Sequence, residues 1–105
     1  MRIELLYVQG CPNLDLARER LWGALRELGS KDAVTETLVI DAAAASRLGF
    51  LGSPSIRIDG VDIEPTSRRG RAFGLACRTY GEDGPPQGAP SQELIEKALR
   101  EGKDG

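Results

Sequence analysis

The feature that most constrains the fold is a nearly continuous apolar run near the start of the chain, Ile3–Val8. A strand with one exposed face alternates apolar and polar residues, whereas a run without alternation is typical of a central strand buried on both faces. Such a strand needs other elements packed above and below its sheet, which favours an α/β architecture. The run ends at Gln9-Gly10, and Cys11-Pro12 follows directly.

The next segment has the spacing of an amphipathic helix. Apolar residues recur three or four positions apart, and charged residues occupy the rest of the wheel. Proline is favoured in a first helical turn because its missing N–H needs no partner there, and glycine is a natural C-terminal stop. We therefore predict a helix from Pro12 to Leu28, ended by Gly29, with the apolar positions Leu14, Ala17, Leu21, Leu25 and Leu28.

A second strand and a short helix follow. Val34–Ile40 is rich in β-branched residues, which are typical of strands. Asp41 is a suitable N-cap for a helix over Ala42–Leu48, and Gly49 is a suitable stop. The strand Ile3–Val8, the helix Pro12–Leu28 and the strand Val34–Ile40 follow one another in this order. This order predicts a right-handed parallel crossover between the two strands.

Two short β-rich runs, Ser55–Ile58 and Val61–Glu64, flank Asp59-Gly60. Asp-Gly between such runs is a strong hairpin signal. Pro90-Ser91 opens a last helix, with Ser91 as its cap. The apolar face of that helix consists of Leu94, Ile95, Ala98 and Leu99.

Residues 65–90 form a long connection that is rich in Gly, Pro and Arg. In a compact domain a connection of this length is usually either functional or disordered. Its guanidinium groups could stabilise a thiolate or bind the carboxylates of a substrate, which makes Arg78 a candidate binding residue; the alternative is a solvated loop. We predict one domain over residues 1–105, with 65–90 as an inserted segment and 102–105 as a frayed tail.

Composition narrows the chemistry. The 105 residues include no histidine, which removes Ser-His-Asp and Cys-His catalysis and every zinc site that needs imidazole. The net charge of −2 gives no reason to expect a nucleic-acid partner. No stretch approaches the roughly 18 apolar residues of a membrane span, and no signal-peptide pattern is present. The sequence therefore predicts a cytoplasmic protein without a membrane partner, and it points to no cofactor.

Two motifs, taken at their mutual spacing, resemble the thioredoxin superfamily. One is the apolar strand that runs into Cys11-Pro12 at a helix start. The other is the segment Leu48–Ile56, which is similar to the family's segment around its cis-proline and is followed directly by a hairpin. The resemblance covers residues 1–64 and 90–101. It implies a thioredoxin-like β-α-β-α-β-β-α fold, with a four-stranded mixed sheet flanked by helices.

The chain departs from the family pattern at three positions. The redox motif of the family is Cys-x-x-Cys, and Leu14 stands where its second cysteine would be. Gly10 replaces a residue that is often Trp, and Leu5 replaces the buried acid beneath the site. The resemblance is therefore to members with one cysteine in the motif, or to members that take a second cysteine from elsewhere.

Cys11 is the predicted nucleophile. Unpaired N–H groups and the macrodipole at a helix N-terminus stabilise a thiolate, which is the reactive form in disulfide exchange and peroxide reduction. The alternative is a buried and inert cysteine. Pro12 lies beside Cys11 in the sequence and is grouped with the predicted substrate-binding residues.

The resemblance also implies a cis peptide bond before Pro54, with the backbone groups of Ser53 turned toward Cys11. An extended peptide or glutathione would pair with these groups like an added strand. Cys77 lies in the inserted segment, and it would act as a resolving cysteine if that segment folds over Cys11. Alternatively, Cys77 and its apolar neighbours merely cover an exposed face.

Three functions stay open at this point. The first is a thiol-based redox protein whose partner is a small molecule or protein carrying a thiol or disulfide; as an enzyme it would be a thiol-disulfide oxidoreductase. The second is a thiolate-binding protein for a soft metal or an organomercurial, because two thiolates without histidine suit soft metals. The third is a non-catalytic scaffold, since a fold does not determine function.

Overall fold

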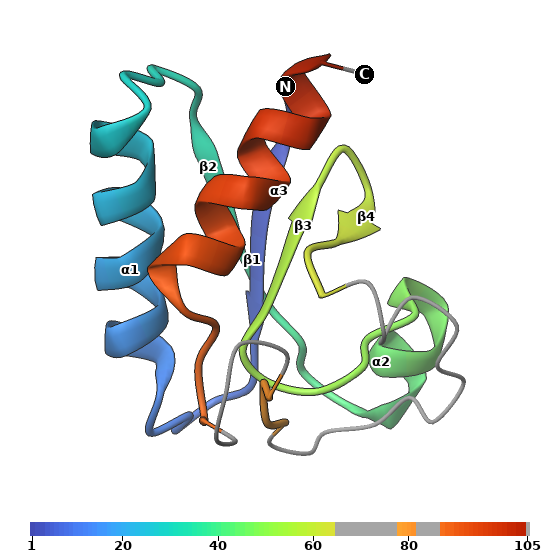
Figure 1. Ribbon diagram of the computed structural model, residues 1–105. Helices are drawn as coiled ribbons and strands as arrows, with labels where there is room; N and C mark the ends of the chain where they lie inside the picture. Colours follow the sequence, from blue (N-terminus) through green and yellow to red (C-terminus); the bar gives the residue numbers. More distant parts are fainter. Residues whose placement is uncertain (65–77, 82–86, 105) are drawn as a thin grey trace.

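The computed structural model describes residues 1–64, 78–81 and 87–104. Within these residues the strands form one four-stranded mixed sheet in the order β2-β1-β3-β4 (Figure 1). β1 (Ile3–Tyr7) pairs in parallel with β2 (Val34–Leu38) and antiparallel with β3 (Ser55–Ile58), and β3 pairs antiparallel with β4 (Val61–Asp62). The predicted mixed sheet is confirmed, although β2 and β4 end two residues earlier than expected.

Three helices in the described residues flank the sheet: α1 (Leu14–Glu27), α2 (Ala42–Leu48) and α3 (Gln92–Asp104). Figure 1 shows α1 and α3 together on one face of the sheet and α2 on the other. Each face therefore has a core of its own. Side chains from α1, α3 and the sheet form the larger core, which includes Ile3, Leu5, Leu21, Leu25, Ile56 and Ile95. The smaller core under α2 consists of Leu6, Val39, Ala44, Ala45 and Phe50.

β1 shows why a continuous apolar run forms the central strand. Successive side chains of a strand point to opposite faces of its sheet. Leu5 belongs to the core under α1 and α3, whereas Leu6 belongs to the core under α2. Both side chains are at most 1% exposed. Helices on both faces therefore require apolar residues at successive positions, and the predicted α/β architecture is confirmed.

The two ends of α2 agree with the sequence-based prediction. The Asp41 carboxylate accepts a hydrogen bond from the Ala44 N–H at 2.8 Å, which satisfies one of the donors left free at a helix start. Gly49 ends the helix in the left-handed conformation, with φ 63°. Glycine adopts this conformation without the steric cost that a Cβ would add.

Replacing Asp41 with alanine is expected to lower the free energy of unfolding by about 0.5–2 kcal/mol, because the Ala44 N–H loses its acceptor. The measurement is urea unfolding followed by circular dichroism. Ser46→Ala, at an exposed position within the same helix, is the matched control and is expected to leave stability unchanged or slightly higher. Equal losses in the two variants would contradict the capping role.

The Asp59-Gly60 hairpin and the start of α3 are also as predicted. Both turn residues have positive φ, 52° and 83°, as a type I′ turn requires. The Ser91 hydroxyl accepts from the Leu94 N–H at 3.1 Å and caps α3.

The far end of α3 differs from the prediction, because the helix continues to Asp104 where a frayed tail was expected. A Cβ on Gly102 would lie only 2.9 Å from a methyl carbon of Ile58. Gly102 of the last turn therefore packs closely against Ile58 of β3. None of the helices in the described part of the chain is long and apolar enough to cross a membrane.

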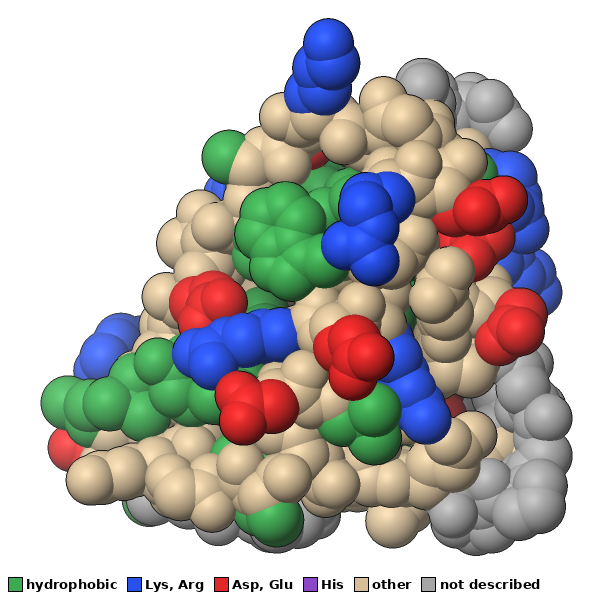
Figure 2. Space-filling model, turned by 90° about the vertical axis from the view of Figure 1, so that its left-hand side faces the viewer, with side chains coloured by type: hydrophobic (Ala, Val, Ile, Leu, Met, Phe, Trp, Pro, Cys, Tyr) green, Lys and Arg blue, Asp and Glu red, His purple; other side chains and the backbone are tan. Residues whose placement is uncertain are grey.

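The outer face formed by α1 and β2 carries charged side chains of both signs (Figure 2). The Arg18 guanidinium of α1 bonds there to the Glu36 carboxylate of β2 at 2.7 Å and to Asp15 at 3.1 Å. Apolar side chains lie between these charges, including Trp22, which is 45% exposed. Charges of both signs are thus mixed on this face, and Arg18 pairs with two of its carboxylates.

Candidate functional site

Cys11 lies in two tight turns that connect β1 to α1. Its N–H donates to the Val8 carbonyl at 3.2 Å, and its own carbonyl accepts from the Leu14 N–H at 3.4 Å. Gly10, in the first of these turns, has φ 74°, a conformation that favours glycine. The thiol is free and partly exposed. The chain thus presents Cys11 at the carboxyl end of the central strand.

α1 begins two residues later than predicted. Its N-cap is Asn13, whose side chain makes no capping hydrogen bond, and its first residue is Leu14. Pro12 is exposed and precedes the N-cap, so the expectation that it occupies the first helical turn is wrong. Cys11 therefore stands before the helix rather than at its start.

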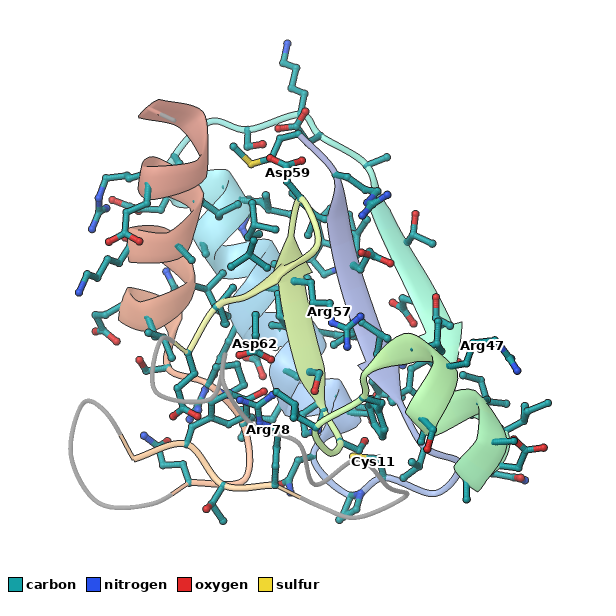
Figure 3. The ribbon with its side chains drawn as sticks, turned by 90° about the vertical axis from the view of Figure 1, so that its right-hand side faces the viewer. Cys11, Arg47, Arg57, Asp59, Asp62 and Arg78 are labelled. Atoms are coloured by element: carbon teal, nitrogen blue, oxygen red, sulfur yellow. The ribbon has the colours of Figure 1, made fainter. Side chains whose placement is uncertain are left out.

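The loop between α2 and β3 contains the predicted cis peptide bond, Ser53-Pro54. Ser53 is fully buried, and its hydroxyl accepts from the Val8 N–H at 3.1 Å. Val8 in turn accepts from the N–H of Cys11. Val8 therefore bonds both to the cis-proline loop and to Cys11. Figure 3 shows Cys11 and Arg78 near this end of the sheet.

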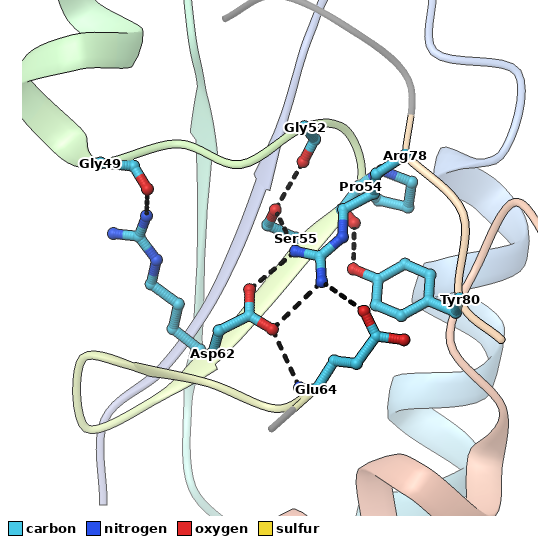
Figure 4. A network of polar contacts seen from close by, with 9 residues as sticks. Gly49, Gly52, Pro54, Ser55, Asp62, Glu64, Arg78 and Tyr80 are labelled. Carbon is cyan, nitrogen blue, oxygen red and sulfur yellow. Dashed lines mark hydrogen bonds and ion pairs between the residues drawn. The ribbon is translucent and has the colours of Figure 1, made fainter. Parts of the chain in front are cut away.

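Arg78 lies in a buried polar cluster beside the cis-proline loop (Figure 4). Its guanidinium donates to Asp62 at 2.7 and 3.2 Å, to Glu64 at 3.1 Å and to the Ser55 hydroxyl at 3.0 Å. It also packs over the Tyr80 ring, 4.3 Å from the centroid. Burial by itself lowers the pKa of Arg78, but the hydrogen bonds and negative charge of Asp62, with help from Tyr80 and Glu64, raise the pKa above its usual value. The guanidinium therefore stays charged.

This cluster gives the Arg78 guanidinium partners within the protein, while its role in binding a substrate stays a prediction. Arg78 is only 8% exposed, and its guanidinium bonds to side chains of the same protein. Sequence reasoning missed its partners, Asp62 and Glu64, because nothing in the local pattern shows that these two carboxylates are buried and therefore need a cation.

The main chain of the same segment is bonded to the cis-proline loop. The Arg78 N–H donates to the Ser53 carbonyl at 3.1 Å, and the Tyr80 hydroxyl donates to the Pro54 carbonyl. Burial raises the pKa of Tyr80, against the opposing charge of Arg78, so the hydroxyl keeps its proton and remains a donor. The Ser53 carbonyl thus already has an internal partner, and the role of the Ser53 backbone in binding a substrate stays a prediction.

The segment continues from the cis-proline loop to the start of α1. Tyr80 and Gln87 pair through two backbone hydrogen bonds, of 2.7 and 2.8 Å. Gly88 packs so closely against Asn13 that a Cβ would lie 2.2 Å from the Asn13 side-chain nitrogen. Arg20 of α1 also donates to the Ala89 carbonyl at 3.3 Å. The described parts of the segment thus contact the cis-proline loop on one side, and Asn13 and α1 on the other.

Comparisons of the chain with family models, with curated proteins and with solved structures find no match. A fold by itself does not determine function. The chemistry of this protein therefore has to be derived from its side chains and their contacts.

Two surface hollows differ in their relation to Cys11. The larger, about 630 Å³, is lined by Met1, Asp59 and Gly102 among others. Figure 3 shows Asp59 at the opposite end of the sheet from Cys11, so this hollow is not part of the site. A smaller hollow of about 270 Å³ is lined by Leu38–Ile40 and by Val8, the residue that accepts from Cys11.

The second predicted redox residue, Cys77, lies outside the described residues. It is the sequence neighbour of Arg78, whose N–H is bonded to Ser53. Among the residues that the structure does describe, no three His, Cys, Asp or Glu side chains are grouped in a way that could hold a metal ion.

Proposed function

We propose that this protein is a thiol-disulfide redox protein of thioredoxin-like topology, with Cys11 as its nucleophile. The observation that carries the proposal is a partly exposed, free Cys11 tied through Val8 to a cis-proline loop. The strand order β2-β1-β3-β4, with one parallel and two antiparallel pairings, supports the topology.

The exposure of Cys11 favours a reactive role over a structural one. Structural cysteines are buried and inert, whereas an attacking thiolate must reach the sulfur of its substrate. Cys11 belongs to neither hydrophobic core, and Pro12 beside it is exposed and free to contact a substrate. In the cytoplasm, the compartment predicted from the sequence, thiols are kept reduced, so the resting protein is the dithiol.

The proposed reaction consists of two exchanges. The Cys11 thiolate attacks one sulfur of a disulfide RSSR; the substrate S–S bond breaks, a Cys11–SR mixed disulfide forms, and the leaving thiolate takes up a proton. The Cys77 thiolate then attacks the Cys11 sulfur and releases the second RS⁻. The protein loses two electrons and becomes a Cys11–Cys77 disulfide, while RSSR is reduced to two thiols. A dithiol reductant restores the protein by the reverse exchange.

Cysteine variants separate the two steps. After reaction with oxidised glutathione, the wild type is expected to give a Cys11–Cys77 linked peptide in the mass spectrum of the digested monomer, and dithiothreitol should remove it. Cys77→Ser should stop at a glutathione adduct on Cys11. Cys11→Ser should give neither product. Ser46→Ala, exposed on α2, is the control for handling and should behave as the wild type.

Two outcomes would contradict the proposed roles of Cys11 and Cys77. If both thiols of the folded wild type stay free in the presence of excess oxidised glutathione, and alkylate no faster than a buried cysteine, then Cys11 is not a nucleophile. If the mixed disulfide forms but Cys77 never displaces glutathione, Cys77 is not the resolving cysteine.

A further inference from the structure

We infer that the segment Arg78–Tyr80 occupies the position in which an extended polypeptide would pair with the cis-proline loop, so that Cys11 exchanges with small disulfides in preference to disulfides within polypeptides. This inference rests on the proposed function and names the substrate class of that same site. It is based on three properties of the described residues. The Ser53 carbonyl already accepts a hydrogen bond from within the protein, charged groups hold the segment Arg78–Tyr80 in place, and the Cys11 thiol is only partly exposed.

The acceptor is the Ser53 carbonyl. A polypeptide that adds to a sheet edge binds through main-chain hydrogen bonds, and the carbonyl before Pro54 is the group it would meet next to the Cys11 turn. In this protein the Arg78 N–H donates to that carbonyl at 3.1 Å. A carbonyl oxygen has a second lone pair, but Ser53 is 0% exposed, so a donor from outside cannot reach it.

The segment is held by charged groups that an incoming peptide cannot replace. The Arg78 guanidinium is bonded to the buried carboxylates of Asp62 and Glu64, and the Tyr80 hydroxyl is bonded to the Pro54 carbonyl. Displacing the segment would break the bonds of the guanidinium to both buried carboxylates, which is unfavourable. A peptide backbone offers only neutral N–H groups in exchange. Pairing by an external strand is therefore disfavoured at this edge.

The thiol itself stays within reach of a small molecule. Cys11 is partly exposed. The hollow of about 270 Å³ is lined by Val8 and Gln9 of the same connection, and Cys11 itself does not line it. A small disulfide therefore reaches the thiol from solvent, without displacing the segment Arg78–Tyr80.

The test compares two substrate classes on the full-length protein. The rate of thiol release is measured with oxidised glutathione and with a linear peptide whose two cysteines form a disulfide within an extended segment. Wild-type protein is expected to react at least about tenfold faster with glutathione disulfide. Tyr80→Phe, which removes the bond to Pro54 but keeps the ring, is expected to raise the peptide rate severalfold and to leave the glutathione rate within about twofold. Tyr7→Phe, a tyrosine outside the cluster, is the matched control.

A second measurement does not depend on a variant. Amide hydrogen exchange of the wild type is expected to show the Arg78 N–H as well protected as the N–H groups of β3, and the peptide disulfide should not change this protection. The inference is overturned if wild-type protein reduces both classes at similar rates, if Tyr80→Phe raises both rates equally, or if the peptide exposes the Arg78 amide. A folded wild type that reacts with neither class overturns the proposed function instead.

Discussion

Replacing Arg78 with methionine is expected to lower the free energy of unfolding by about 3–5 kcal/mol, the loss typical of breaking a buried ion pair from one side. Methionine retains much of the apolar stem but removes the guanidinium that bonds to Asp62 and Glu64, which are 7% and 5% exposed. Domains of this size have a total stability of about 5–15 kcal/mol, so the effect is a large part of the whole. Urea unfolding followed by circular dichroism measures it.

A surface arginine provides the matched control for this prediction. Arg18 also contacts two carboxylates, Asp15 and Glu36, but its side chain is 38% exposed and water screens the charges. Arg18→Met is therefore expected to have a much smaller effect. Replacing Arg78, Asp62 and Glu64 together by apolar residues should recover most of the lost stability, since these three are the buried charged residues of the described part of the chain. Equal losses for the two arginine variants would show that burial of the Arg78 cluster contributes nothing.

Replacing Phe50 with alanine is expected to lower the free energy of unfolding by about 3–5 kcal/mol, because it leaves a cavity in the smaller core. Phe50 is 0% exposed and is the largest side chain of the core between the sheet and α2. Its N–H also donates to the Ala45 carbonyl at 2.8 Å, which joins the end of α2 to the loop that leads to Pro54. Thermal and urea unfolding of the variant measure the loss.

Ile40→Ala is the control for the cavity, because Ile40 is 71% exposed and its truncation creates no void. Its effect is expected to stay within about 0.5 kcal/mol. A Phe50→Ala variant as stable as the control would mean that α2 closes onto the sheet without this side chain. The smaller core would then not be what holds the cis-proline loop in place.

Local patterns in the sequence were sufficient to predict most of the elements. The apolar run of β1, the Asp41 cap of α2 and the Asp59-Gly60 turn each depend on residues a few positions apart. The physical forces involved, side-chain periodicity, capping hydrogen bonds and the φ preference of glycine, act over the same short range. The α/β class and the parallel β1–β2 pairing followed from the order of these elements.

The first residue of α1 could not be predicted from the local sequence. Pro12 suits a first helical turn as judged from its own chemistry, yet two successive turns around Cys11 delay the helix to Leu14. The bond from Val8 to Ser53, residues 45 positions apart, holds that turn against the cis-proline loop. No pattern within the segment itself contains this information.

The buried cluster was decided by the tertiary structure alone. In the sequence, Arg78 belongs to an arginine-rich connection that reads as a solvated loop, and its acceptors lie 14 to 23 residues away. Only the packed fold brings these groups together out of water, where a charge is tolerated when it is paired and hydrogen-bonded. The sequence by itself thus determined the elements, their order and the presence of Cys11 after β1. The tertiary structure decided that Arg78 binds the protein's own carboxylates and that its N–H bonds to the Ser53 carbonyl of the cis-proline loop. The reason is that burial, which no short segment encodes, sets the cost of an unpaired charge.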